Sequence, residues 1–281
     1  MTYARSTIVS VADTPYYHCT SRCVRRAFLC GRDRFTGKSF EHRRDWIAAR
    51  LALLTEVFAI DLCGYALMHN HYHLVLRLAP QRTATWSDAE VVERWSRIFK
   101  RRTVIDRYVA GMVLDEDDAA SAARILALWR ERLGSLSWFM RCLNECIARR
   151  ANLEDECSGR FWEGRYHSQA LLDEQALLTA MAYVDLNPVR AKLADTLETS
   201  DYTAIQSRLR SARSTQIDTT AVPHLVPFFQ HDLDPGTAPL PFTWPAYLEL
   251  VTATGRILRS DKRGVLCDEP PELLQTLGIE F

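Results

Sequence analysis

Two histidines stand two positions apart in a stretch whose alternation is typical of a strand. His71 and His73 open the run His-Tyr-His-Leu-Val-Leu-Arg-Leu at 71–78. Successive side chains of a strand point to opposite faces, so both imidazoles are expected on one face, about 7 Å apart along the chain. Two parallel imidazoles are half of a divalent-metal site. The stretch therefore predicts a site that other residues must complete.

A tyrosine and an asparagine later in the chain are candidates for the second half of that site. Tyr183 and Asn187 are four residues apart, so they share one face of a predicted helix. The proline at 188 disfavours the α region for Asn187, and we expect the helix to end there. A phenol beside a metal-bound phosphate can attack phosphorus, since the metal polarises the phosphate oxygens. Taken singly, the tyrosine is typical of core packing and the asparagine of a turn.

The surrounding pattern predicts an α+β fold. Segment 15–22 alternates weakly and predicts a first strand, on which Tyr17 and His18 either border the site or pack. Apolar residues at helical spacing predict a helix over 40–58. Two strands at 60–68 and 71–78 then form a hairpin.

Helical patterns dominate the middle of the chain. A capping-box spacing at Ser87 opens a series of helices that ends at about residue 157. A loop and short strand at 159–170 follow, and then a helix from Gln175 to Leu186 that Asp173 or Glu174 opens. Beyond these, 210–241 has no clear period and is interpreted as a linker or irregular arm, and 244–279 as two short helices around a basic turn.

Composition limits the class of protein. The 35 basic and 35 acidic residues balance, so net charge does not indicate a nucleic-acid partner, although the arginines form local clusters. No run of about 18 apolar residues predicts a membrane span, and the N-terminus lacks the apolar region of a secretory signal. The eight cysteines are interpreted as reduced thiols, which favours the cytoplasm.

Three segments together resemble the single-tyrosine HUH transposases, whose motif is two histidines around a hydrophobic residue. HNHYHLVL at 69–76 resembles that motif, and YVDLNPVRAKLA at 183–194 resembles the family's Tyr-x-x-x-Asn-Pro-Val-Arg-Ala segment. RFWEGRYHSQ at 160–169 resembles the Phe-Trp-Glu stretch that leads into the tyrosine helix. The likeness is closest to the REP-associated tyrosine transposases, also described as insertion-sequence-200-like, and covers roughly Tyr16 to Leu209.

The resemblance implies a fold with three parts. These are a ferredoxin-like palm at 14–209 (β-α-β-β-α-β, antiparallel sheet), a helical insert within it at about 81–157, and a C-terminal linker and small helical extension at 210–281. The His pair is expected on a central strand of this palm, and the tyrosine on the helix that follows.

The resemblance also implies an activity. Tyr183 would attack single-stranded DNA, forming a 5′-phosphotyrosine and freeing a 3′-OH. His71 and His73 would hold Mg²⁺ or Mn²⁺, and Asn187 matches the position of a third ligand. The implied partners are hairpins of REP-like DNA, with a monomer favoured and a dimer possible, in the cytoplasm at the nucleoid. A DNA-binding protein that has lost turnover is the alternative.

Two residues depart from the simplest form of the family. His69 stands where the family often has Pro or Ser, so three histidines alternate and a structural zinc site becomes a third hypothesis, since imidazole suits zinc better than magnesium. Tyr72 is a rival phenol, but its strand position directs it away from the His pair, so we reject it as the nucleophile.

Binding of hairpin DNA requires cations that face phosphates. Four arginines close in sequence to the palm edge or the tyrosine helix are the candidate contacts, namely Arg22, Arg25, Arg165 and Arg190. Phe161 and Trp162 lie among such cations, and core packing is favoured for them over stacking on a base.

Overall fold

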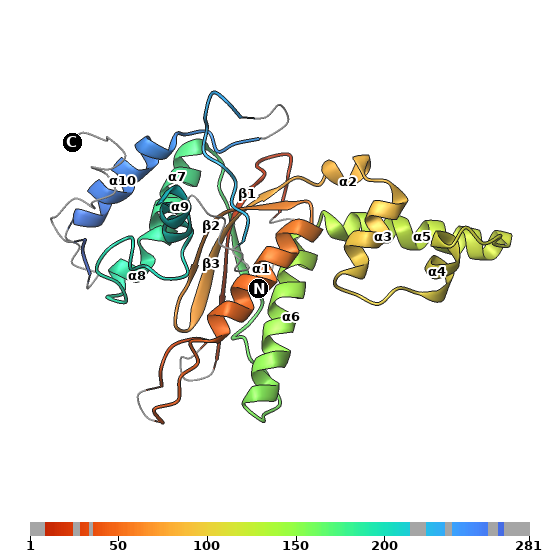
Figure 1. The fold of residues 1–281 in the computed structure, drawn as a ribbon, viewed down its shortest axis with the longest axis horizontal. Coiled ribbons are helices and arrows are strands. Elements are labelled where there is room, and N and C mark those ends of the chain that lie inside the picture. The colour runs from red at the N-terminus through yellow and green to blue at the C-terminus, as the bar shows by residue number, and fades with distance from the viewer. Residues whose placement is uncertain are drawn as a thin grey trace.

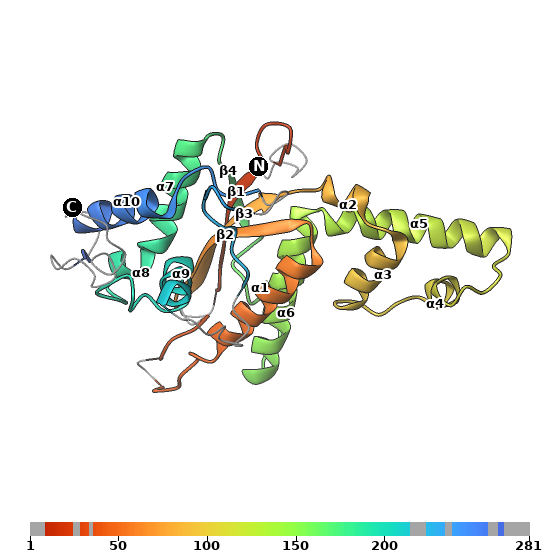
Figure 2. The same ribbon diagram turned by 45° about the horizontal axis from the view of Figure 1, so that its top comes forward.

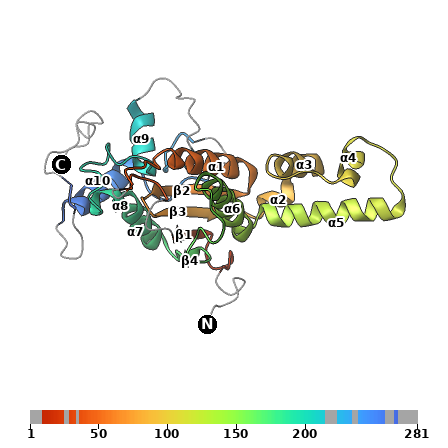
Figure 3. The same cartoon turned by 90° about the horizontal axis from the view of Figure 1, so that it is seen from below.

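A four-stranded antiparallel sheet forms the centre of the molecule (Figure 1). Its strands are β1 (Tyr16–Arg22), β2 (Ile60–Leu67), β3 (His71–Leu78) and β4 (His167–Ala170), in the order β2-β3-β1-β4. Figure 3 shows the four strands side by side in this order. The computed structural model describes residues 9–24, 29–33, 36–213, 223–233, 238–257 and 264–266.

Two helices cover one face of the sheet. Helix α1 (Arg43–Val57) joins β1 to β2, and α6 (Leu136–Glu154) precedes β4 and lies alongside α1 (Figures 1 and 3). The rings of Phe58 and Phe139 meet edge to face, with centroids 5.5 Å apart, between these elements. The series β1-α1-β2-β3-α6-β4 has the β-α-β-β-α-β order of a ferredoxin-like palm, which confirms the predicted fold class.

The opposite face carries helices from the last third of the chain. Helix α7 (Glu174–Asp185) packs on β2 and β3, followed by α8 (Asn187–Arg190), α9 (Ala204–Arg213) and α10 (Trp244–Arg256). In Figure 1 these helices lie on the other side of the sheet from α1 and α6. Alternate residues of β3 divide between the two cores: Leu74 packs with the α1 and α6 side, and Val75 with the α7 and α10 side.

A helical arm projects from the palm (Figures 1 and 2). It consists of α2 (Arg82–Thr85), α3 (Asp88–Ser96), α4 (Thr103–Val109) and α5 (Glu116–Leu133). The predicted cap is present, because Ser87 Oγ accepts the Glu90 N–H at 3.2 Å. The indoles of Trp95 and Trp129 stack at 5.0 Å and join α3 to α5. The interval 81–157 therefore contains both this arm and α6, a helix of the palm.

A buried hydrogen-bond cluster fixes β3 from the α6 side. Tyr72 is fully buried, and its hydroxyl donates to Asn144 Oδ1 and lies 3.1 Å from Ser21 Oγ. Asn144 Nδ2 is 3.0 Å from the same Ser21 Oγ. Because side chains alternate along a strand, this arrangement turns both neighbours of Tyr72 toward α7. Tyr72 thus points away from the His pair, as predicted.

The C-terminal part of the chain is joined to α7 through a buried carboxylate. Asp185 is fully buried, and it accepts the Ile205 N–H at 3.0 Å and the Tyr247 hydroxyl. Burial raises the pKa of Asp185 to about 6. These bonds connect α9 and α10 to the helix that carries Tyr183.

Part of the predicted linker at 210–241 forms a backbone hydrogen bond with the sheet. Its described portion contacts the palm, since the Val226 N–H donates to Leu62 O of β2 at 2.9 Å. Helix α10 confirms the first helix expected at 244–279, and the second lies outside the described residues.

We predict that Asp185→Ala lowers the free energy of unfolding by at least about 2 kcal/mol, because it leaves two buried donors without an acceptor. Tyr247→Phe should cost less, since Asp185 keeps the Ile205 N–H. Urea denaturation measures both changes. Asp232→Ala, at an exposed carboxylate, is the control and should change stability by less than about 0.5 kcal/mol. Equal stability of Asp185→Ala and wild type would contradict the prediction.

Candidate active site

The His pair projects from β3 toward α7. His73 lies opposite Thr20 of β1 and Ala66 of β2, in the middle of the sheet, and only 6% of it is exposed. The ring centroids of His71 and His73 are 4.8 Å apart, with the planes at 81°. The strand therefore holds the two imidazoles next to each other on one face.

Tyr183 and Asn187 approach this pair from two helices. The ring of Tyr183 meets that of His73 edge to face, with centroids 5.5 Å apart, and Asn187 Nδ2 is 3.2 Å from His73 Nε2. Tyr183 is 45% exposed, so solvent and a large substrate can reach it. The structure thus brings the predicted nucleophile and all three predicted ligands together.

The backbone between these two residues bends without unwinding. Helix α7 ends at Asp185, and Leu186 keeps helical angles (φ −82°, ψ −6°) before the single turn of α8 begins at Asn187. Pro188 lies in the first turn of α8, where its missing N–H is not required. The expected helix end is therefore a bend.

His18 is a fifth side chain at the site. Its Nε2 is 3.0 Å from His73 Nδ1, and the two rings stack with centroids 5.2 Å apart. Its ring also meets the Tyr183 ring edge to face at 6.1 Å. The sequence placed His18 on the first strand without assigning it to the site. The pairing of His18 with Val75 is what turns it toward α7.

The three imidazoles are neutral at physiological pH. Burial lowers the pKa of His71 to about 4, with a smaller effect of Arg22. Burial and then the neighbouring His71 and His18 lower the pKa of His73 to about 3. The pKa of His18 falls to about 4, through burial and His167. Neutral imidazole is the form that binds metal, so these rings are ready to act as ligands.

The hydrogen bonds suit a metal held at Nε2 of both β3 histidines. His71 Nδ1 is 2.6 Å from Asn70 Oδ1, an acceptor that requires the proton on Nδ1 and leaves the Nε2 lone pair available. The Asn187 amide that faces His73 also carries a carbonyl oxygen, which is a ligand for Mg²⁺ and Mn²⁺. Two imidazoles and an amide oxygen therefore fit the expected divalent ion.

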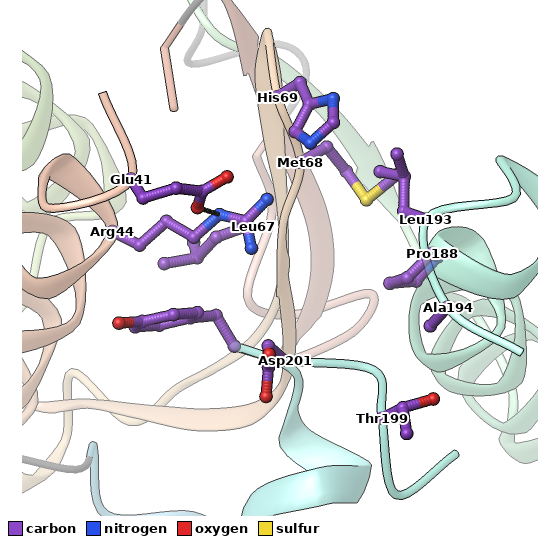
Figure 4. Close-up of a pocket in the computed structure, with 11 residues that line it drawn as sticks. Glu41, Arg44, Leu67, Met68, His69, Pro188, Leu193, Ala194, Thr199 and Asp201 are labelled. Carbon is purple, nitrogen blue, oxygen red and sulfur yellow. Dashed lines mark ion pairs between the residues drawn. The ribbon is translucent and has the colours of Figure 1, made fainter. Parts of the chain in front are cut away.

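The hypothesis of a zinc site made by His69, His71 and His73 is wrong. Among the described residues, no group of three or more His, Cys, Asp or Glu side chains is arranged to hold a metal ion. His69 precedes β3, and its ring lies against Gly31, where an added Cβ would be 2.8 Å from His69 Cδ2. The ring lines a cavity of about 350 Å³ at the tip of the β2–β3 hairpin (Figure 4). The turn therefore places His69 outside the strand alternation that brings His71 and His73 to one face.

The four candidate DNA contacts differ in their surroundings. Arg22 is exposed, lies opposite His71 in the pairing of β1 with β3, and is 3.8 Å from the exposed Glu163. Arg165 is exposed in the loop before β4. Arg25 lies outside the described residues. Phe161 and Trp162 are buried, in agreement with the preference for core packing.

Arg190 is bound within the protein. Its guanidinium donates to three carbonyl oxygens at and beyond the end of α10, those of Thr254, Ile257 and Gly264. A positive charge near the C-terminal end of a helix interacts favourably with the exposed carbonyl oxygens there. Arg190 therefore connects α8 to α10, and a phosphate would have to displace these bonds.

Comparisons with known proteins add the following. No family model and no curated protein matches the chain. Among solved structures, the chain is similar to a REP-associated tyrosine transposase bound to a REP hairpin, with 9% sequence identity and a TM-score of 0.44. That match covers 80% of this chain and 99% of the other. Within the described ranges, no helix is long and apolar enough to cross a membrane.

We predict that acid destabilises the metal-free protein through its buried histidines. Their pKa values are lowered on folding, so their contribution to stability is complete above pH 6.5 and is lost as the pH falls toward about 4 to 3. Urea denaturation in EDTA at pH 7, 6, 5 and 4 measures this loss. The double variant His71→Gln, His73→Gln should lose less stability across the range. The same slope in both proteins would contradict the prediction.

Proposed function

We propose that this protein is a single-stranded DNA endonuclease and strand transferase that acts on hairpin DNA through a 5′-phosphotyrosine. The observation that supports the proposal is the convergence of Tyr183, His73 and Asn187 from α7, β3 and α8. This geometry agrees with the resemblance of the HNHYHLVL and YVDLNPVRAKLA segments to HUH transposases. A half-exposed phenol beside the buried, neutral imidazole of His73 suits attack on a large, flexible substrate.

The reaction follows from the positions of these groups. Tyr183 Oη forms a bond to phosphorus and loses its proton, while the bond from phosphorus to the 3′ oxygen breaks and that oxygen takes up a proton. The reverse reaction with another 3′-OH joins strands. A bound Mg²⁺ or Mn²⁺, held by His71, His73 and Asn187, would polarise the phosphate oxygens. The bend at Leu186 places the amide of Asn187 beside His73 and leaves the phenol free.

Phosphate contacts are proposed at two arginines that flank the site. Arg22 lies directly opposite His71 in the sheet, so a strand that crosses the His pair would pass its guanidinium. Arg165 is exposed and precedes His167 of β4 by two residues, and His167 lies opposite Thr20 of β1. We further expect a monomer that acts in the cytoplasm at the nucleoid.

We predict that wild-type protein incubated with labelled single-stranded hairpin DNA and Mn²⁺ forms an adduct that survives denaturing electrophoresis. Tyr183→Phe removes the attacking oxygen and should abolish the adduct, with hairpin binding close to that of wild type. Tyr108→Phe is the matched control, since Tyr108 is 40% exposed on the arm and should leave the adduct intact. An adduct formed by Tyr183→Phe would eliminate the assignment. Binding without any adduct in the wild type would favour the DNA-binding protein that has lost turnover.

Arg22→Ala should weaken hairpin binding for all sequences and reduce the slope of log K against log salt by about 1, because one phosphate contact is lost. Fluorescence anisotropy at several salt concentrations measures this slope. Arg149→Ala is the control, as Arg149 is highly exposed on α6, on the other face of the sheet. Equal slopes for Arg22→Ala and wild type would exclude Arg22 as a phosphate contact.

A further inference from the structure

His18 approaches the candidate metal site from behind His73. Of the two ring nitrogens of His73, Nε2 faces Asn187 at 3.2 Å and Nδ1 faces His18 Nε2 at 3.0 Å. The two rings lie nearly parallel, with the planes at 18°. Both nitrogens of His73 are therefore occupied by defined neighbours, one on the metal side and one on the side of β1.

The hydrogen bond between the two histidines has two possible directions. If His18 Nε2 carries the proton, His73 must carry its own proton on Nε2 and cannot bind metal through that atom. If His73 Nδ1 carries the proton and His18 Nε2 accepts it, the Nε2 lone pair of His73 is free. Only the second arrangement provides a ligand on the side where Asn187 and His71 lie.

The other histidine of the pair, His71, has a hydrogen bond of the same kind. Asn70 Oδ1 is an obligatory acceptor and holds the proton of His71 on Nδ1. A metal-binding histidine usually donates its other ring N–H to a partner that fixes its tautomer and orientation. Asn70 meets that need for His71, and His18 is the side chain placed to meet it for His73.

We propose that His18 is a positioning residue that accepts the Nδ1 proton of His73 and thereby directs the Nε2 lone pair of His73 to a divalent cation. The inference rests on the proposed function for the identity of the cation site. It gives the first strand a role in the metal site, beside the phosphate contact proposed at Arg22. His18 touches neither the cation nor the phosphate in this scheme.

Two substitutions separate the hydrogen bond from the packing. His18→Phe keeps an aromatic ring stacked on His73 and removes the acceptor. His18→Gln removes the ring, and its amide oxygen can reach the place of Nε2 and accept the proton. His167→Phe is the control, because His167 lies on the same face of β4 and is exposed. If His18 acts through packing alone, His18→Phe should resemble wild type. If His18 acts as the hydrogen-bond acceptor, His18→Gln should resemble wild type.

The first measurement is the tautomer of His73 in metal-free protein, from the ¹⁵N chemical shifts of its ring in a long-range ¹H–¹⁵N spectrum. Wild type and His18→Gln should carry the proton on Nδ1, and His18→Phe should shift it to Nε2. The second is Mn²⁺ affinity by calorimetry without DNA. His18→Phe should bind Mn²⁺ about 10- to 100-fold more weakly, with affinity largely restored in His18→Gln and unchanged in His167→Phe.

Equal Mn²⁺ affinity in wild type and His18→Phe, or the Nδ1 tautomer in both, would overturn the inference. So would a wild type that binds no Mn²⁺. The DNA adduct assay is independent of these measurements. A wild type that binds Mn²⁺ through the predicted tautomer but forms no adduct would remove the proposed function and leave the role of His18 in metal binding.

Discussion

The packing of α7 against β2 and β3 is the contact on which the rest of the site depends. Leu177, Met181 and Val184 are buried in this layer with Val75 of β3. Because the layer is apolar, it fixes the height of the helix above the sheet and so the separation of Tyr183 from His73. Burial on this face of the sheet lowers the pKa of both imidazoles and so favours their neutral form.

Burial of so many polar rings is costly unless their hydrogen bonds are satisfied. At His73 both nitrogens have partners, and at His71 one nitrogen is bonded to Asn70. On the other face of β3, Tyr72 and Asn144 form a second polar cluster. The central strand is therefore held by specific bonds from both sides, which leaves little freedom for a shift in register.

Local patterns predicted the elements that depend on local physics. The alternation of His71 and His73, the opposite direction of Tyr72, the cap at Ser87 and the strands around the hairpin all follow from periodicity and capping. The α+β class followed from the order of those elements. These features need only the geometry of a single strand or helix turn.

Features that depend on contacts between distant segments could not be predicted from the sequence. The sequence does not state that His18 pairs with Val75, and so His18 was not assigned to the site. The sequence shows Arg43 and Arg44 only as a basic pair, whereas Arg43 is 1% exposed and forms ion pairs with Glu154 and Asp155 at the end of α6. The sequence predicts Arg190 as a DNA contact, whereas its guanidinium donates to carbonyl oxygens at and beyond the end of α10. In each case the partner is remote in sequence.

The bend at Leu186 has a mechanical consequence. Tyr183 and Asn187 lie on two helical segments with Leu186 between them, and helical hydrogen bonds run across this residue, since the Leu186 N–H donates to Ala182 O and the Arg190 N–H donates to Leu186 O. Arg190 connects α8 to α10, and the Tyr247 hydroxyl connects α10 to Asp185 of α7. The positions of the Asn187 amide and of the Tyr183 phenol therefore both depend on α10.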